Sequence, residues 1–117
     1  MIKIKIKPVA KPRMTRSDKW KKRPVVMNYR AYCDELRYKL KGYQIGGELK
    51  VIFYLPMPAS MSKKKKAELN LTPCLKRIDC DNLVKGFQDA LTEEDSYIWH
   101  IDVKKLWAYE GAIEIYE

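Results

Sequence analysis

The stretch Asp79-Cys-Asp-Asn-Leu-Val-Lys-Gly-Phe-Gln-Asp-Ala-Leu91 combines an apolar stripe with evenly spaced charges. Its apolar residues recur every three or four positions, which is the period of one face of an α-helix. These residues are Leu83, Phe87, Ala90 and Leu91. The spacing predicts a helix from about Cys80 to Leu91, with the stripe buried against the rest of the protein.

Carboxylates crowd this helix and the turn after it, although the chain as a whole is basic. Residues 79–95 contain six acidic residues and a single cation, Lys85. The six are Asp79, Asp81, Asp89, Glu93, Glu94 and Asp95. Carboxylates repel a phosphate ligand unless a divalent cation inverts the local charge. Hard oxygen donors select magnesium or manganese, so the segment predicts a metal site.

The spacing within this segment fits phosphodiester hydrolysis. Asp79 and Asp81 flank the helix start, where both carboxylates can point the same way if Asp79 is extended. Lys85 lies ~6 Å further along the helix axis on the face of Asp81, and Asp95 can return from the turn after the helix. A metal held there would polarise a phosphoryl oxygen and activate a bound water. The lysine would add positive charge beside the developing phosphorane.

A purely structural interpretation of these aspartates also stays open. An Asp at a helix N-terminus is a common cap, which contributes ~1 kcal/mol and needs no metal. Asp81 and Lys85 are also spaced for an ordinary i,i+4 ion pair, which contributes a few tenths of a kcal/mol. The short pattern D-x-D-N does not decide between a metal site and two caps.

The whole chain is strongly basic for its length. Its 117 residues carry 24 Lys and Arg against 15 Asp and Glu, a formal net charge of +9. Such a surface favours a polyanionic partner, with nucleic acid ahead of an acidic membrane. No stretch approaches the ~20 apolar residues of a membrane span, and none resembles a signal peptide, so we expect a cytoplasmic protein without a membrane partner. Cys33, Cys74 and Cys80 lack CxxC spacing and are expected to be reduced structural thiols.

The remaining periodicities predict an α/β fold that forms one small domain over residues 1–117. Alternating isoleucines and lysines indicate a half-buried first strand that Pro8 ends. Residues 8–27 show no clean period and are predicted to form a long basic loop. We then expect a helix over residues 28–41 that is capped by Asn28. The other elements expected are a strand over 48–55, a short helix over 62–69, and two strands over 98–109 and 112–116 that pair as a hairpin. Together they predict one mixed sheet packed by two main helices.

The run over residues 79–98 resembles the RusA family of Holliday junction resolvases, which are small, basic endodeoxyribonucleases often carried by phages and prophages. The family pattern is D-x-D-N-L-x-K, a continuation similar to F-D-A-L, and a turn with D-D-x-x-[IV]. Every element occurs here in order. The variations are an extra residue in Phe87-Gln88-Asp89, and Glu94 in place of the first Asp of the acidic pair. The resemblance extends over most of the chain but is specific only over residues 77–98.

The resemblance implies a homodimeric α/β nuclease that nicks two opposed strands of a four-way DNA junction symmetrically, with magnesium or manganese as cofactor. It implies that Asp79, Asp81 and Asp95 bind the metal, and that they act in catalysis together with Lys85. Asp89 matches a recurring acidic position to which we assign no catalytic role. A dimer supplies two identical sites in the symmetric relation that paired cuts require.

DNA phosphates are expected to bind the basic loop and the residue just before the acidic motif. The expected contacts are Lys11, Arg13, Arg16 and Arg77. Two other functions stay open. One is a basic nucleic-acid-binding protein that does not cut and whose aspartates are helix caps. The other is a structural or regulatory phage protein that keeps the fold without the activity.

Overall fold

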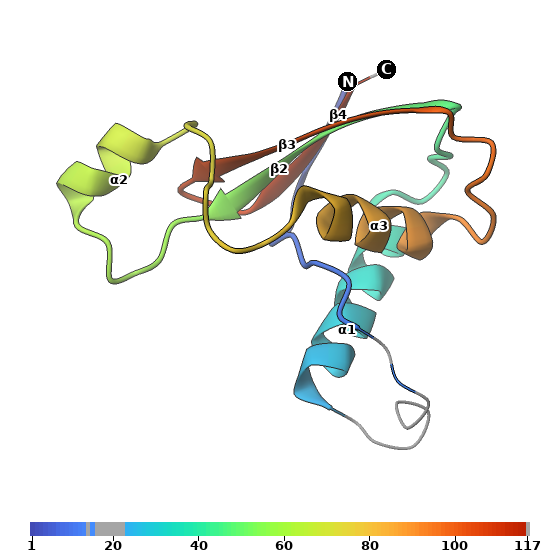
Figure 1. The fold of residues 1–117 in the computed structure, drawn as a ribbon, viewed down its shortest axis with the longest axis horizontal. Coiled ribbons are helices and arrows are strands. Elements are labelled where there is room, and N and C mark those ends of the chain that lie inside the picture. The colour runs from blue at the N-terminus through green and yellow to red at the C-terminus, as the bar shows by residue number, and fades with distance from the viewer. Residues whose placement is uncertain (14, 16–22, 117) are drawn as a thin grey trace.

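The computed structural model describes residues 1–13, 15 and 23–116, which form four strands and three helices (Figure 1). In chain order these are β1 (Ile2–Lys5), α1 (Pro24–Lys39), β2 (Glu48–Pro56), α2 (Lys63–Leu69), α3 (Cys80–Leu91), β3 (His100–Ala108) and β4 (Ala112–Tyr116). The predicted α/β class and mixed sheet are confirmed. Within this described part of the chain, none of the helices combines the length and apolarity needed to cross a membrane.

The strands form one sheet in the order β1-β4-β2-β3. β2 and β3 are parallel, with Val51 opposite Val103, whereas β4 runs antiparallel to both β1 and β2. The predicted hairpin between the last two strands is therefore wrong, because β4 inserts between β1 and β2 instead of pairing with β3. All residues of β4 except Tyr116 are buried, whereas β3 exposes much of its length at the edge. The more apolar strand takes the central place, where neighbours screen it on both sides.

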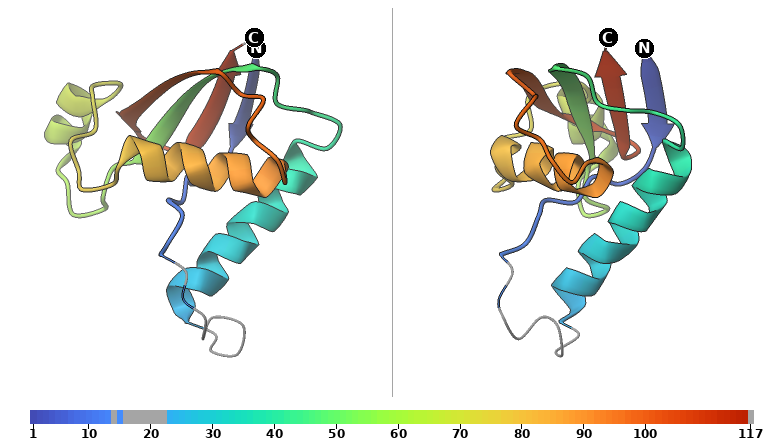
Figure 2. Two further views of the ribbon diagram at one scale, coloured as in Figure 1. Left: turned by 45° about the vertical axis from the view of Figure 1, so that its right-hand side comes forward. Right: turned by 90° about the vertical axis from the view of Figure 1, so that its right-hand side faces the viewer.

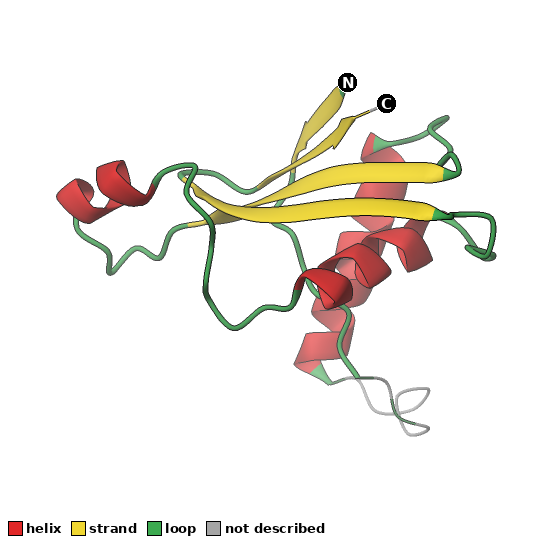
Figure 3. Cartoon of the chain, turned by 45° about the horizontal axis from the view of Figure 1, so that its top comes forward, coloured by secondary structure: helices red, strands yellow, loops and turns green. Residues whose placement is uncertain are grey.

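Both long helices, α1 and α3, cover the same face of the sheet (Figures 2 and 3). Their apolar stripes meet the strands in one core, in which the rings of Phe53 and Phe87 pack edge to face with centroids 6.1 Å apart. Leu36, Leu83 and Ile113 are fully buried in the same core. The predicted packing of the sheet by two main helices is confirmed. This packing holds α3 by the apolar side of the helix and leaves the charged side of the helix in solvent.

Helix α1 begins at Pro24, well before the expected cap Asn28. Pro24 is at the start of the helix, where the fixed φ of proline suits the helix and its missing N–H leaves no hydrogen bond unmade. Asn28 is therefore an exposed residue inside the helix, and its predicted capping role is wrong. The loop predicted over residues 8–27 is also too long, because the N-cap of α1 is Arg23.

The remaining elements lie close to their predicted bounds. Helix α3 matches the prediction at both ends, and β2 extends one residue beyond its predicted end. Helix α2 follows Ser62, whose hydroxyl accepts a hydrogen bond from the N–H of Lys65 at 3.2 Å. This helix lies on an arm at the end of the sheet, away from α1 and α3 (Figure 1).

Candidate active site

The two aspartates at the start of α3 point their carboxylates away from the other residues that the structure describes. Asp79 precedes the helix in an extended conformation, with φ −75° and ψ 137°, and its side chain makes no capping hydrogen bond. Asp81 lies in the first turn, and both residues are exposed. Among the described residues, neither carboxylate has a hydrogen-bond or ion-pair partner within reach. The geometry therefore does not support the interpretation of Asp79 as a side-chain cap.

Lys85 lies one turn further along α3 and contacts two other carboxylates. Its ammonium Nζ is 3.0 Å from Oδ2 of Asp95 and 3.4 Å from Oδ1 of Asp89. The expected i,i+4 pair with Asp81 is not formed, since the i,i+4 partner of Lys85 is Asp89 on its C-terminal side. The hydrogen bond to Asp95 and the nearby charge of Asp89 raise the pKa of Lys85, so the side chain is a cation at neutral pH.

The acidic pair in the turn after α3 divides into two roles. The side chain of Glu94 accepts a hydrogen bond from the N–H of Ser96 at 2.8 Å, and this bond lowers the pKa of Glu94. The hydroxyl of Thr92 donates to the carbonyl of Glu94 at 2.9 Å and closes the same turn. Glu94 thus holds the turn, whereas Asp95 reaches back to Lys85. This division agrees with the variation in the motif, where only the first acid of the pair differs.

The segment before the basic loop is fixed against α3. The N–H of Lys11 donates to the carbonyl of Asn82 at 3.1 Å, and the ammonium of Lys11 pairs with the carboxylate of Asp89. Gly86 makes this approach possible, because a Cβ there would lie 3.1 Å from the main-chain nitrogen of Lys11 and 3.2 Å from the ring of Tyr29. The hydroxyl of Tyr29 donates to the carbonyl of Gly86 at 3.0 Å, so α1, α3 and this segment meet at one point.

The four predicted DNA contacts are placed unequally. Lys11 is only partly exposed and pairs with Asp89, whereas Arg13 and Arg77 are exposed. The carbonyl of Arg13 accepts a hydrogen bond from the guanidinium of Arg23 at 2.9 Å. Arg16 lies outside the described residues. Arg77 lies two residues before Asp79, so its main chain leads directly into the start of α3.

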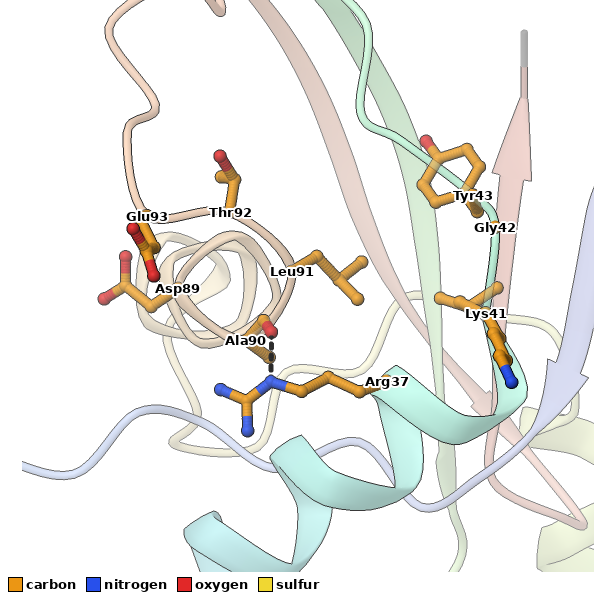
Figure 4. A pocket seen from close by; sticks show the side chains of 10 residues that line it. Arg37, Lys41, Gly42, Tyr43, Asp89, Ala90, Leu91, Thr92 and Glu93 are labelled. Atoms are coloured by element: carbon orange, nitrogen blue, oxygen red, sulfur yellow. Dashed lines mark hydrogen bonds between the residues drawn. The ribbon is translucent and has the colours of Figure 1, made fainter.

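A pocket at the other end of α3 borders this charged face, because Asp89 lines it (Figure 4). It lies between the C-terminal ends of α1 and α3. There Arg37 donates from Nε to the carbonyl of Ala90 at 2.8 Å, which satisfies an acceptor of the last helical turn. Neither Asp79 nor Asp81 lines this pocket. We therefore place the candidate site on the open face of α3.

The donor set suits a hard cation in its chemistry, but its arrangement does not yet form a metal site. Among the described residues, no three His, Cys, Asp or Glu side chains lie close enough together to hold an ion. Within the described part of the chain, Asp79 and Asp81 offer carboxylates without a partner, whereas Asp95 is bound to Lys85. One ion can be shared by all three only if these side chains take other positions than those described.

The link between Lys11 and Asp89 was not predicted from the sequence. The two residues are 78 positions apart, so no local pattern joins them. The available signal was Gly86, because a glycine inside an otherwise regular helix often marks a close approach of another segment.

Comparison with known proteins identifies a family for nearly the whole chain. The model of the family described as "Endodeoxyribonuclease RusA" matches residues 4–116. The chain is also similar to the "Uncharacterized protein YqaN" of Bacillus subtilis (strain 168), with 39% identity over 70 residues. That match covers 53% of this chain and 49% of the relative, so it spans about half of each protein. No solved structure matches the chain.

Proposed function

The chain belongs to the RusA endodeoxyribonuclease family, and on this premise we propose that it is a magnesium-dependent endonuclease that resolves Holliday junctions. The proposed reaction is a pair of symmetric nicks in opposed strands of a four-way junction during recombination or repair. One observation carries the proposal. Asp79 and Asp81, at the start of α3, present carboxylates that have no partner among the described residues, and Asp81 is one turn from the cation Lys85.

Each of these residues has a proposed role. Asp79, Asp81 and Asp95 bind the magnesium ion, with manganese as a possible substitute, and the ion supplies the activation of water and phosphate. Lys85 places a fixed positive charge beside the reacting phosphate, where negative charge increases during the reaction. Binding of the ion by all three aspartates requires side-chain positions other than those described, since the described positions do not gather them.

The DNA surface is proposed to surround this face. Arg13 follows the segment that lies against α3, and Arg77 shortly precedes α3; both are exposed cations. Arg16 comes three residues after Arg13 in the sequence. Their charge would neutralise backbone phosphates without reading the base sequence. Lys11 contributes less directly, because its ammonium is paired with Asp89.

The active unit is proposed to be a homodimer. Two cuts related by symmetry need two sites related by the same symmetry, which a two-fold dimer supplies. One face of the sheet is not covered by α1 or α3 and carries the partly buried Ile52 and Leu106 beside Tyr54 (Figure 3). Sedimentation at micromolar protein tests this part of the proposal. A monomer both with and without junction DNA would contradict it.

The decisive experiment is incubation of the purified protein with a synthetic four-way junction, with and without magnesium. Each strand is labelled in turn, and the products are separated on denaturing gels. We expect paired nicks at symmetric positions only when magnesium is present, and no cutting of a linear duplex of the same sequence. Tight binding without any cutting would instead favour the alternative of a non-catalytic DNA-binding protein.

A further inference from the structure

Asp89 holds two lysines that come from different parts of the chain. Its Oδ1 lies 3.4 Å from the ammonium of Lys85, and its Oδ2 pairs with the ammonium of Lys11. The carboxylate is less exposed than either partner, at 26% against 49% for Lys85 and 32% for Lys11. Asp89 is thus partly buried, and this reduced contact with water strengthens both of its ion pairs.

These contacts continue into a row of alternating charges. Lys11 binds Asp89, Asp89 binds Lys85, and Lys85 binds Asp95. The row connects three separate stretches: the segment before the basic loop, the charged face of α3 and the turn after α3. In this row a carboxylate lies between the two lysines, and a lysine lies between the two carboxylates. No two like charges are therefore neighbours.

The Lys11 end of this row is anchored by the main chain. The N–H of Lys11 is bonded to the carbonyl of Asn82 at 3.1 Å, and Gly86 leaves room for the segment to lie against the helix. The side chain of Lys11 therefore starts from a fixed point near the first turns of α3 and reaches Asp89 in a later turn. Lys85 lies between these two points on α3. It is bound by the carboxylate of Asp89, and Lys11 holds that carboxylate from the opposite side.

We propose that Asp89 is a positioning residue, which orients Lys85 towards the reacting phosphate. It also links that orientation to the segment before the basic loop, which contains Lys11. The inference rests on the proposed nuclease function. Asp89 itself carries the wrong charge to contact phosphate, so it acts only through its two lysines. Lys11 fixes Asp89 from the side opposite Lys85. The orientation of Lys85 therefore depends on the placement of the segment that carries Lys11.

The first test compares Asp89→Asn with the matched control Glu35→Gln. Glu35 pairs with Lys39 at 3.1 Å on α1, so its replacement removes one negative charge from an i,i+4 pair elsewhere. We expect Asp89→Asn to lower the single-turnover nicking rate by about tenfold to a hundredfold, the usual cost of a misplaced catalytic group. Junction affinity, measured without magnesium, should stay equal or increase. Glu35→Gln should change neither quantity.

The second test asks whether Lys11 acts through Asp89. Lys11→Met should lower the nicking rate in the parent protein but cause no further loss in Asp89→Asn. Rates that fall independently, so that the two effects multiply, would overturn the proposed link. A well-folded Asp89→Asn protein that nicks pre-bound junctions at the parent rate would overturn the positioning role itself.

A readout without catalysis separates this inference from the proposed function. Hydrogen exchange in a peptide that includes residues 9–11 should be faster in Asp89→Asn than in the parent, because the ion pair that helps to hold Lys11 against α3 is lost, and unchanged in Glu35→Gln. Equal exchange in all three proteins would overturn the link between Asp89 and the segment. If the parent itself cuts no junction while the exchange differs as expected, the nuclease proposal fails but this link stands.

Discussion

Lys85 and Asp95 are joined by a contact of 3.0 Å between Nζ and Oδ2, which binds the turn after α3 to the middle of the helix. The neighbouring acid, Glu94, takes no part in it and accepts a hydrogen bond from the main chain of Ser96. Two adjacent carboxylates thus have different partners, and each can be changed without removing the contact of the other.

Asp95→Asn should abolish nicking, whereas Glu94→Gln should leave it within a few-fold of the parent. The asparagine removes the charge of a proposed metal ligand, while the glutamine oxygen can still accept the hydrogen bond from Ser96. Nicking rates of the two variants on one junction provide the measurement. Equal losses in both would mean that the turn, and not Asp95, is what the reaction needs.

Asp79→Asn and Asp81→Asn should each abolish nicking while junction affinity stays equal or increases. Each change removes a proposed metal ligand, and it also removes a negative charge from a surface that accepts phosphate. Because the Asp79 side chain makes no capping bond, its loss should leave the melting temperature nearly unchanged. A stability loss of ~1 kcal/mol with normal nicking is the pattern that a helix cap predicts, and it would contradict the metal site.

Lys85→Met should stop nicking without tightening DNA binding, since it removes a cation and not a carboxylate. This difference in affinity distinguishes it from the aspartate variants. Lys85→Arg keeps the charge but changes the shape of the donor group, so we expect partial activity at most. Rate and affinity measured on the same preparations check both points. Full activity in Lys85→Met would remove this residue from the proposed mechanism.

Gly86→Ala should destabilise the protein by about 1 kcal/mol, although alanine is the better helix former. The helical preference favours alanine by up to ~1 kcal/mol, but overpacking a tight contact costs about 1–3 kcal/mol. The new Cβ would lie 3.1 Å from the nitrogen of Lys11 and 3.3 Å from the carbonyl oxygen of Val9, and both are main-chain atoms.

Gly46→Ala is the control for that experiment, because a Cβ there has nothing within 4 Å. Its effect on the free energy of unfolding should be within about 0.5 kcal/mol. Urea denaturation of both variants gives the comparison. A Gly86→Ala protein that is more stable than the parent would show that the segment containing Lys11 moves away from α3 at little cost.

Neutralising Arg13 and Arg16 together should weaken binding to all DNA shapes and reduce its dependence on salt. Loss of two phosphate contacts should lower the slope of log affinity against log salt by roughly 1.8. The control removes two exposed lysines, Lys41 and Lys104, which belong to neither the basic segment nor the charged face of α3. An identical change of slope in both double variants would indicate a general charge effect without a defined contact.

The sequence predicted elements whose burial follows from local periodicity and missed those that depend on distant partners. Helix α3 was located at both ends because its apolar stripe, at Leu83 and Phe87, is complete within the segment. The pairing of β4 was missed because strands adjacent in sequence usually pair. Glu114 also made β4 look partly exposed in the sequence, because a charged residue usually lies in solvent. In the structure it is buried, and its carboxylate accepts hydrogen bonds from the hydroxyls of Tyr54 and Tyr116.

The same distinction applies to the candidate site. Spacing alone brought Asp81 and Lys85 to one face of one helix, because positions four apart are neighbours on a helix surface, and it placed Asp79 just before the start of that helix. Which carboxylate binds Lys85 was not predictable, since Asp89 and Asp95 compete with Asp81 and the outcome depends on the turn after the helix. The capture of Lys11 by Asp89 depends on the tertiary fold.

The insertion of β4 between β1 and β2 also has a consequence for synthesis. Ile2 pairs with Ile115, and Val51 pairs with that same residue from the other side. A nascent chain that has not yet passed residue 116 therefore lacks a central strand, and β1 has no partner in the sheet. Pairings between such distant residues make folding slow compared with helix formation. The core that supports α3 includes Ile113 and Ile115 of β4, so this support for the candidate site is complete only after β4 has been synthesised.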